Sequence, residues 1–155
     1  MPDESWRGKV GTLETEEIRA FLDEPRIARL ACLDEYGWPY AVPCWQEWDG
    51  EAFWVVPRER SAWARFLQND ERCAITVDED GSQRKVTAQC RAVLVETPNV
   101  GGQWVPIATR MSRRYLGENG PRYLYPTMDK PRWLFRLEPT RLQTWQGQDW
   151  AARYK

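Results

Sequence analysis

The chain has 155 residues, of which 42% are hydrophobic and 29% charged, the composition of one globular domain that can bury a core. Its net charge of −1 argues against a nucleic-acid-binding protein, and no apolar run approaches the roughly 20 residues of a membrane helix. Residues 1–5 are polar and acidic, unlike a signal peptide, so we expect a cytoplasmic protein.

The chain contains no histidine. This removes Ser-His and Cys-His catalytic dyads, the usual zinc and non-haem iron sites, and a haem with a proximal histidine. The four cysteines have no CxxC spacing and fall within predicted strands, which favours reduced, buried thiols. We therefore expect no metal site, and any chemistry needs carboxylates, Arg, Lys, Tyr, Cys or a cofactor.

The first predicted elements are a loosely ordered arm over residues 1–11 and a helix over 16–22. Thr15 is the candidate N-cap of this helix. Pro25 follows the helix closely and prevents it from continuing.

Five strands and one short helix follow, with a turn signal at almost every junction. Asp49-Gly50 lies between two apolar runs, which is a strong hairpin signal because both central residues of such a turn need positive φ. Ser61 is the candidate N-cap of the short helix. The strands are predicted over 26–33, 39–48, 52–56, 72–77 and 84–96. Antiparallel strands at this spacing favour a small barrel with a groove where a ligand can bind.

The last third of the chain contains a helix predicted over 105–115, which Gly117 ends as a left-handed C-cap. The segment 120–130 is rich in Pro and Tyr and is predicted to be irregular. Two final strands, over 133–137 and 142–145, are expected to be joined by a Glu-Pro-Thr turn. We see no internal repeat, and we expect a single domain over residues 1–155.

Ten tryptophans are far above normal usage. Tryptophan fills cores, and it also lines ligand sites and subunit interfaces. A tryptophan-filled core explains most of the ten. Five of them occur within one window, however, and they are more than a barrel of this size can fully bury: Trp38, Trp45, Trp48, Trp54 and Trp63.

Several segments occur in an order and at a spacing that point to one family, although no single motif is diagnostic. They are 21–31, 34–45, 48–50, 58–61, 69–77, 114–117 and the closing strand pair up to Trp145. Together they resemble the pyridoxamine 5′-phosphate oxidase-like proteins, or FMN-binding split barrels, a superfamily that includes deazaflavin-dependent reductases. The resemblance spans most of residues 14–146. It implies a mainly β (α+β) fold, an antiparallel six- to seven-stranded split β-barrel with a few flanking helices, and a homodimer with two equivalent cofactor sites at its interface.

The resemblance also implies that the cofactor phosphate lies near the start of the helix after the third strand. The residue types agree, because Arg58, Arg60, Ser61 and Arg65 place three guanidinium groups and a hydroxyl at a helix N-terminus with free N–H groups. Without the resemblance, a solvated charged turn with Glu59 neutralising one neighbour is the simpler interpretation.

The chain departs from the family pattern at one position. Family members commonly carry a lysine two residues after the serine as a phosphate ligand, and here that position is Trp63. A tryptophan cannot neutralise a phosphate. Either Arg58, Arg60 or Arg65 substitutes for the lysine, or cofactor affinity is weak, or the ligand differs. Trp63 could instead stack on a ring.

The resemblance further implies that the isoalloxazine ring lies against the backbone of the second and third strands. The matching positions are Val42, Pro43, Cys44, Trp45, Val55 and Val56. Backbone N–H and C=O groups there can bond the pyrimidine edge of the ring. Trp45 and Trp54 could cover the ring, and ordinary packing is the alternative for both.

The first functional hypothesis is an oxidoreductase that uses FMN, or the deazaflavin coenzyme F420, to transfer hydride to a small organic substrate. The substrate pocket would be built by 103–125. No catalytic residue is assigned. Tyr40, Tyr115 and Tyr123 are candidate proton donors, and each has a structural role as its alternative.

Two other hypotheses remain open. One is a barrel that stores or senses a flavin or another planar ligand without catalysis, which the departure at Trp63 favours. A single-stranded nucleic-acid binder is disfavoured by the negative net charge. We therefore expect a flavin-type cofactor, a small-molecule substrate and a second copy of the chain as partners, and neither nucleic acid nor membrane.

Overall fold

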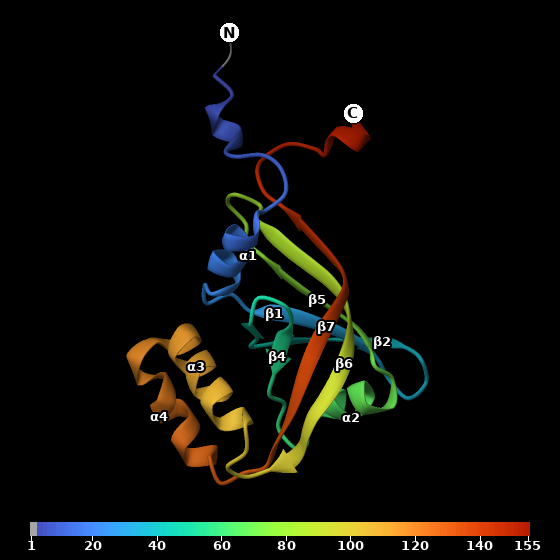
Figure 1. The fold of residues 1–155 in the computed structure, drawn as a ribbon, viewed down its shortest axis with the longest axis vertical. Helices are drawn as coiled ribbons and strands as arrows, with labels where there is room; N and C mark the ends of the chain where they lie inside the picture. Colours follow the sequence, from blue (N-terminus) through green and yellow to red (C-terminus); the bar gives the residue numbers. More distant parts are fainter. Residues whose placement is uncertain (1–2) are drawn as a thin grey trace.

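In the computed structural model, which describes residues 3–155, seven antiparallel strands form one sheet that curls into half of a barrel (Figure 1). The strands are β1 (Ala28–Leu33), β2 (Pro39–Cys44), β3 (Glu47–Trp48), β4 (Phe53–Val55), β5 (Arg72–Asp78), β6 (Lys85–Asn99) and β7 (Arg132–Trp145). Their order across the sheet is β2-β1-β5-β6-β7-β4-β3. The prediction of a mainly β, antiparallel six- to seven-stranded fold is therefore confirmed.

Helices cover the ends and one side of the sheet. They are α1 (Thr15–Leu22), α2 (Ala62–Asn69), α3 (Trp104–Leu116) and α4 (Gly120–Leu124), with 3₁₀ turns η1 (Ser5–Arg7), η2 (Gly117–Asn119), η3 (Tyr125–Thr127) and η4 (Ala152–Tyr154). Figure 1 shows α3 and α4 packed side by side, away from the end where the arm and the C-terminal tail lie. The segment predicted to be irregular is thus largely helical.

The arm and the tail are joined by a backbone bridge. Gly11 and Gln146 exchange hydrogen bonds of 3.1 and 2.9 Å, which extends the pairing beyond β7. Met1 and Pro2 belong to the arm predicted to be loosely ordered, and they lie outside the described residues.

The single strand predicted over 39–48 is wrong, because the chain leaves the sheet after β2 and re-enters it as β3 at the opposite edge. Gln46 lies at the crossing and is completely buried. Its side-chain Nε2 donates a hydrogen bond of 2.9 Å to the carbonyl of Leu22 at the end of α1. A buried amide side chain with a partner on a helix fixes this crossing, and strand alternation alone does not show it.

The two final strands predicted over 133–137 and 142–145 are also wrong, since β7 runs through both without a break. The register between β6 and β7 shifts at Gln89, so that Thr140 is an extra residue on β7. Its hydroxyl donates a hydrogen bond of 3.2 Å to the carbonyl of Gln89. This β-bulge accommodates Pro139, which has no N–H for the ladder.

Two caps differ from the sequence prediction. The N-cap of α1 is Glu14 rather than Thr15, in a capping box where Glu17 Oε1 accepts the Glu14 N–H at 3.1 Å. Gly117 ends α3 with a positive φ of 79°, but its ψ of −160° is not that of a left-handed helical residue.

The apolar residues form two clusters. The main core lies between the sheet and helices α1 and α2, and it includes Phe21, Phe53 and Phe135, all fully buried. The second cluster joins α3, α4 and β7 around Trp104, which is also fully buried. In the described part of the chain, all four cysteines are free thiols, as predicted; three are buried and Cys44 is half-buried.

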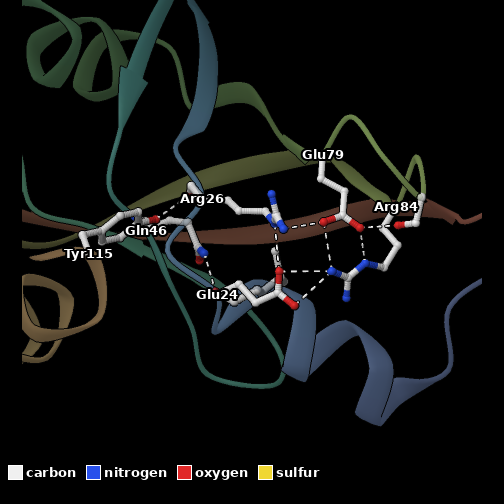
Figure 2. Close-up of polar contacts among 8 residues, drawn as sticks. Glu24, Arg26, Gln46, Glu79, Arg84 and Tyr115 are labelled. Carbon is white, nitrogen blue, oxygen red and sulfur yellow. Dashed lines mark hydrogen bonds and ion pairs between the residues drawn. The ribbon is translucent and has the colours of Figure 1, made fainter. Parts of the chain in front are cut away.

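An ion-pair cluster connects the end of α1 to the hairpin between β5 and β6 (Figure 2). Arg84 donates hydrogen bonds of 3.0 Å to Glu24 and 2.9 Å to Glu79, and Arg26 pairs with both carboxylates. The Arg84 guanidinium also lies 4.9 Å from the ring centroid of Phe21. The hydrogen bond from Arg84 lowers the pKa of Glu79 from its ordinary value of 4.5 to about 2.

Replacing Glu79 with glutamine should lower the free energy of unfolding by about 2 kcal/mol at pH 7, because the side chain loses its charge but keeps its size. The folded-state pKa of Glu79 is lowered. Its contribution is therefore present in full above the ordinary pKa and is lost as the pH falls towards 2. Urea unfolding of both proteins at several pH values should show the difference disappearing in acid.

The matched control is Asp78→Asn. Asp78 pairs with Arg29 at 2.8 Å on the exposed surface. Its loss should cost less than about 0.5 kcal/mol. Equal losses in the two variants at pH 7 would contradict the role given to the Glu79 cluster.

Candidate functional site

A cavity of about 440 Å³ opens where four parts of the fold meet: the end of β2, the loop from β4 into α2, the α3–α4 pair and the start of β7. This volume is within the range of small-molecule sites. Of the described residues, those lining it are Ile27, Pro43, Cys44, Trp45, Val56, Pro57, Arg58, Ser61, Trp63, Ala108, Met111, Tyr123, Leu124 and Arg132. We call this the β2–β4 cavity.

Seven of the eleven residues predicted to bind a cofactor lie together in this lining. They are Pro43, Cys44, Trp45, Val56, Arg58, Ser61 and Trp63. They come from three segments, so the fold brings together the positions that the family resemblance selected. That these residues bind a cofactor stays a prediction.

The other four predicted residues lie outside the lining. Val42 is half-buried against the main core, and Val55 is fully buried within it. Val55 and Val56 are neighbours on an extended chain, so their side chains point in opposite directions and only one can face the cavity. Arg60 and Arg65 are exposed, on the turn before α2 and on α2 itself.

Arg132 is the first residue of β7 and lies on the cavity wall with only 7% of its surface exposed. One amino nitrogen donates a hydrogen bond of 3.0 Å to Thr127 Oγ1, and the guanidinium lies 5.4 Å from the ring centroid of Trp104. Its Nε is buried and has no hydrogen-bond partner. A buried guanidinium with an unsatisfied donor is unusual and calls for a structural or functional reason.

Arg58 lies beside Arg132, because the two residues form an isolated antiparallel bridge. Within residues 3–155, neither arginine belongs to an ion pair. Burial lowers the pKa of Arg132, and the positive charge of Arg58 lowers it further. No carboxylate is found in the lining among the described residues, so the cavity is positively charged and suits an anionic group.

The aromatic wall of the cavity is held from behind by Tyr115. The Trp45 ring stacks on the Tyr115 ring with centroids 5.1 Å apart and planes 3° from parallel. The Tyr115 hydroxyl donates to the carbonyl of Arg26 at 2.8 Å and accepts the N–H of Gln46 at 3.2 Å (Figure 2). Burial raises the pKa of this phenol. Tyr115 therefore positions Trp45 and is not free to donate its proton to a ligand.

The remaining titratable groups limit the chemistry of the cavity. Of the three tyrosines considered as proton donors, only Tyr123 is in the lining, whereas Tyr40 packs edge-on against Phe66. Burial raises the pKa of Cys44 to about 12, so its thiol is neutral at physiological pH and a poor nucleophile.

Seven lining residues were not assigned to the cofactor site from sequence: Ile27, Pro57, Ala108, Met111, Tyr123, Leu124 and Arg132. The four between 108 and 124 do fall in the segment predicted to build the substrate pocket. Arg132 was missed altogether. The available signal was an arginine directly before three consecutive apolar residues, Trp133, Leu134 and Phe135, a run typical of a strand that is buried on both faces.

Replacing Tyr115 with phenylalanine should lower the free energy of unfolding by about 1–2 kcal/mol, because the Gln46 N–H and the Arg26 carbonyl lose their partner. Chemical denaturation measures this loss. Tyr125→Phe is the matched control, since Tyr125 is 66% exposed and its hydroxyl forms no hydrogen bond in the described chain. An unchanged stability of the Tyr115 variant would contradict the positioning role.

Among residues 3–155, no group of three or more His, Cys, Asp or Glu side chains is arranged to hold a metal ion. None of the helices in this range has the length and apolar character required to cross a bilayer.

Comparisons with known proteins agree with this fold. The sequence profile of the family described as pyridoxamine 5′-phosphate oxidase matches residues 14–146. No curated protein matches the chain. The profile spans most of the sequence, including every segment that lines the β2–β4 cavity.

Solved structures with the same fold differ in the ligands that their names mention. A FAD-binding protein from Mesorhizobium loti has a TM-score of 0.62 at 18% identity, over 91% of this chain and 98% of that one. An F420 reductase has a TM-score of 0.62 at 20% identity, over 80% and 94%. A heme storage protein from Vibrio cholerae has a TM-score of 0.63 at 25% identity, over 85% and 94%.

Proposed function

This chain belongs to the pyridoxamine 5′-phosphate oxidase family, and from this premise we propose that it is an oxidoreductase whose β2–β4 cavity holds FMN or coenzyme F420. Family members include flavin- and F420-dependent reductases as well as heme-binding proteins that are not enzymes. The proposal selects the first class for this chain and assigns a small organic molecule as the substrate.

One observation carries the proposal. Seven residues selected from the sequence by family resemblance, from three separate segments, line a single cavity. Several of the other lining groups are apolar or aromatic, which suits a flat ring, while Arg58 and Arg132 give one side a positive charge that suits a phosphate. The residues present therefore fit a phosphorylated ring cofactor.

Different lining residues would hold different parts of such a cofactor. The backbone of Pro43 and Cys44 and the side chain of Trp45 would lie along the ring, and Ser61 with the arginines would bind the phosphate. When bound, a flavin or deazaflavin supplies hydride transfer. The protein contributes orientation and exclusion of water, and Tyr123 is the one lining tyrosine among the described residues.

We include a homodimer in this proposal. Strand β2 is an edge strand, and the turn before it exposes 81% of Tyr36 and 71% of Trp38. Exposed aromatic groups beside an open sheet edge suit contact with a second copy of the chain. Light scattering should give twice the mass of the chain.

The test is to titrate the purified protein with FMN and with F420, and then to add NADH or NADPH without oxygen. We expect one of the two cofactors to bind. If it is FMN, NADH or NADPH should bleach the bound flavin; if it is F420, the reduced cofactor should be consumed when a small organic substrate is turned over. A protein that binds neither cofactor would refute the proposal.

A second candidate function is storage of a planar ligand without catalysis. It is favoured by the scarcity of acidic proton donors in the lining, where the Cys44 thiol is a weak acid and Tyr123 is the one tyrosine among the described residues. Bound flavin that resists reduction by every donor would support it. Heme fits less well, because the chain has no histidine and the Cys44 thiol does not ionise readily.

A further inference from the structure

We propose that Arg132, together with Arg58, forms the anion-binding pair of the β2–β4 cavity and makes it selective for ligands that carry a phosphate. This inference deepens the proposed function and rests on it. The sequence left open which of Arg58, Arg60 and Arg65 binds the anion. The structure adds Arg132, and only Arg58 of the other three lines the cavity.

The first argument is that the charge of Arg132 is buried without a carboxylate partner. Arg132 is the one charged residue in the described chain that is more than nine-tenths buried. Other arginines with little exposure have carboxylate partners: Arg114 pairs with Glu47, and Arg84 with Glu24 and Glu79. Arg132 has none. Its Nε lacks a hydrogen bond, as do those of Arg7 and Arg114, but each of those two arginines pairs with a carboxylate. An unpaired buried charge is costly, so its presence on a cavity wall points to a negative partner outside the chain.

The second argument is that the guanidinium is held in place before a ligand arrives. Thr127 Oγ1 accepts a hydrogen bond of 3.0 Å from one amino nitrogen, and the Trp104 ring lies 5.4 Å from the guanidinium carbon. A guanidinium fixed by two neighbours loses little conformational freedom on binding, and its planar fork matches two phosphate oxygens.

The third argument is electrostatic. Arg58 and Arg132 are cross-strand partners with the same charge, and like charges directly opposite each other are destabilising. An anion between them would convert this repulsion into attraction. Because no carboxylate lines the described cavity, a bound phosphate would have no competitor for the two guanidinium groups.

The test compares FMN with riboflavin, which has the same ring but no phosphate. Arg132→Gln should raise the dissociation constant for FMN roughly 10- to 100-fold, since it removes charge-assisted hydrogen bonds, and should change that for riboflavin less than about twofold. Arg132→Lys should give an intermediate loss, because it keeps the charge without the fork. Arg65→Gln, on the exposed face of α2, is the matched control and should alter neither constant.

Arg58→Gln is a second variant that is less prone to a folding defect than the Arg132 variants, because Arg58 is exposed and forms no ion pair with a carboxylate within residues 3–155. It should also weaken FMN selectively. Circular dichroism of every variant reports the fold. Equal losses of FMN and riboflavin affinity in Arg132→Gln would show a structural role and overturn the inference, as would unchanged FMN affinity.

Thermal unfolding with inorganic phosphate distinguishes a failure of this inference from a failure of the proposed function. We expect phosphate to raise the melting temperature of the wild-type protein above that in chloride of equal ionic strength, and Arg132→Gln to abolish the rise. If this holds but no flavin or F420 binds, the anion site stands and the proposed function fails. If FMN binds equally to wild type and Arg132→Gln, the inference fails and the proposed function stands. If neither phosphate nor flavin binds the wild-type protein, both fail.

Discussion

Replacing Trp104 with alanine should lower the free energy of unfolding by about 4 kcal/mol, the largest effect that we expect from a single substitution. Trp104 is fully buried at the centre of the cluster that joins α3, α4 and β7. Its indole N–H donates a hydrogen bond of 2.8 Å to the carbonyl of Asn99, and its ring faces the Arg132 guanidinium. The substitution therefore leaves a large cavity, an unpaired carbonyl and a less well-positioned arginine.

Urea denaturation measures this loss, and Trp150→Ala provides the control. Trp150 is 75% exposed, so its removal should change stability by less than about 0.5 kcal/mol. A loss below about 1 kcal/mol for Trp104→Ala would show that α3 does not depend on this packing.

The second large effect is expected for Gly120→Ala, which should cost about 3 kcal/mol because α3 and α4 approach too closely for a side chain. A Cβ at this position would lie 2.0 Å from the carbonyl oxygen of Ser112 and 2.3 Å from its carbonyl carbon. Both are backbone atoms inside α3 and cannot rotate away. The helix α4 would have to move, and with it Tyr123 and Leu124 on the cavity wall.

Gly120→Ala should therefore weaken ligand binding as well as stability, and a joint measurement of unfolding and FMN affinity checks both. Gly117→Ala is the control. Gly117 has a positive φ of 79° but open space around it, so alanine there should cost about 1–2 kcal/mol through backbone strain and leave FMN affinity unchanged. Similar FMN affinities in the two variants would argue that α4 does not shape the site.

Local signals predicted much of the sheet. The Asp49-Gly50 turn does join two antiparallel strands, β3 and β4. The expectation that both central residues have positive φ was partly wrong, because in the described chain Gly50 has positive φ whereas Asp49 does not. Asp49 Oδ1 instead accepts hydrogen bonds from the N–H groups of Glu51 and Ala52, each at 2.8 Å. These side-chain hydrogen bonds stabilise the turn without a positive φ at Asp49.

Features that depend on distant contacts were not predictable in this way. The break between β2 and β3 depends on Gln46 reaching the end of α1, 24 residues earlier. The continuity of β7 through Pro139 depends on a bulge against β6. In each case the sequence contains the local signal, but its outcome is decided by a partner segment that a local pattern does not identify.

In the candidate site, too, some residues were predictable from the sequence and others depend on distant contacts. Family resemblance identified positions near β2, β4 and α2, and most of them line the β2–β4 cavity. Family resemblance did not select Arg132, because two of its neighbours in the fold, Arg58 and Trp104, are far from it along the chain. Only the folded chain shows that its charge has no carboxylate partner among the described residues.

The most direct test of this account is a crystal structure of the protein grown with excess FMN. The account expects the phosphate oxygens at about 2.7–2.9 Å from guanidinium nitrogens of Arg58 and Arg132, with the ring along the backbone of Pro43 and Cys44. An empty β2–β4 cavity under these conditions, or a phosphate bound only by the exposed Arg60 and Arg65, would contradict it.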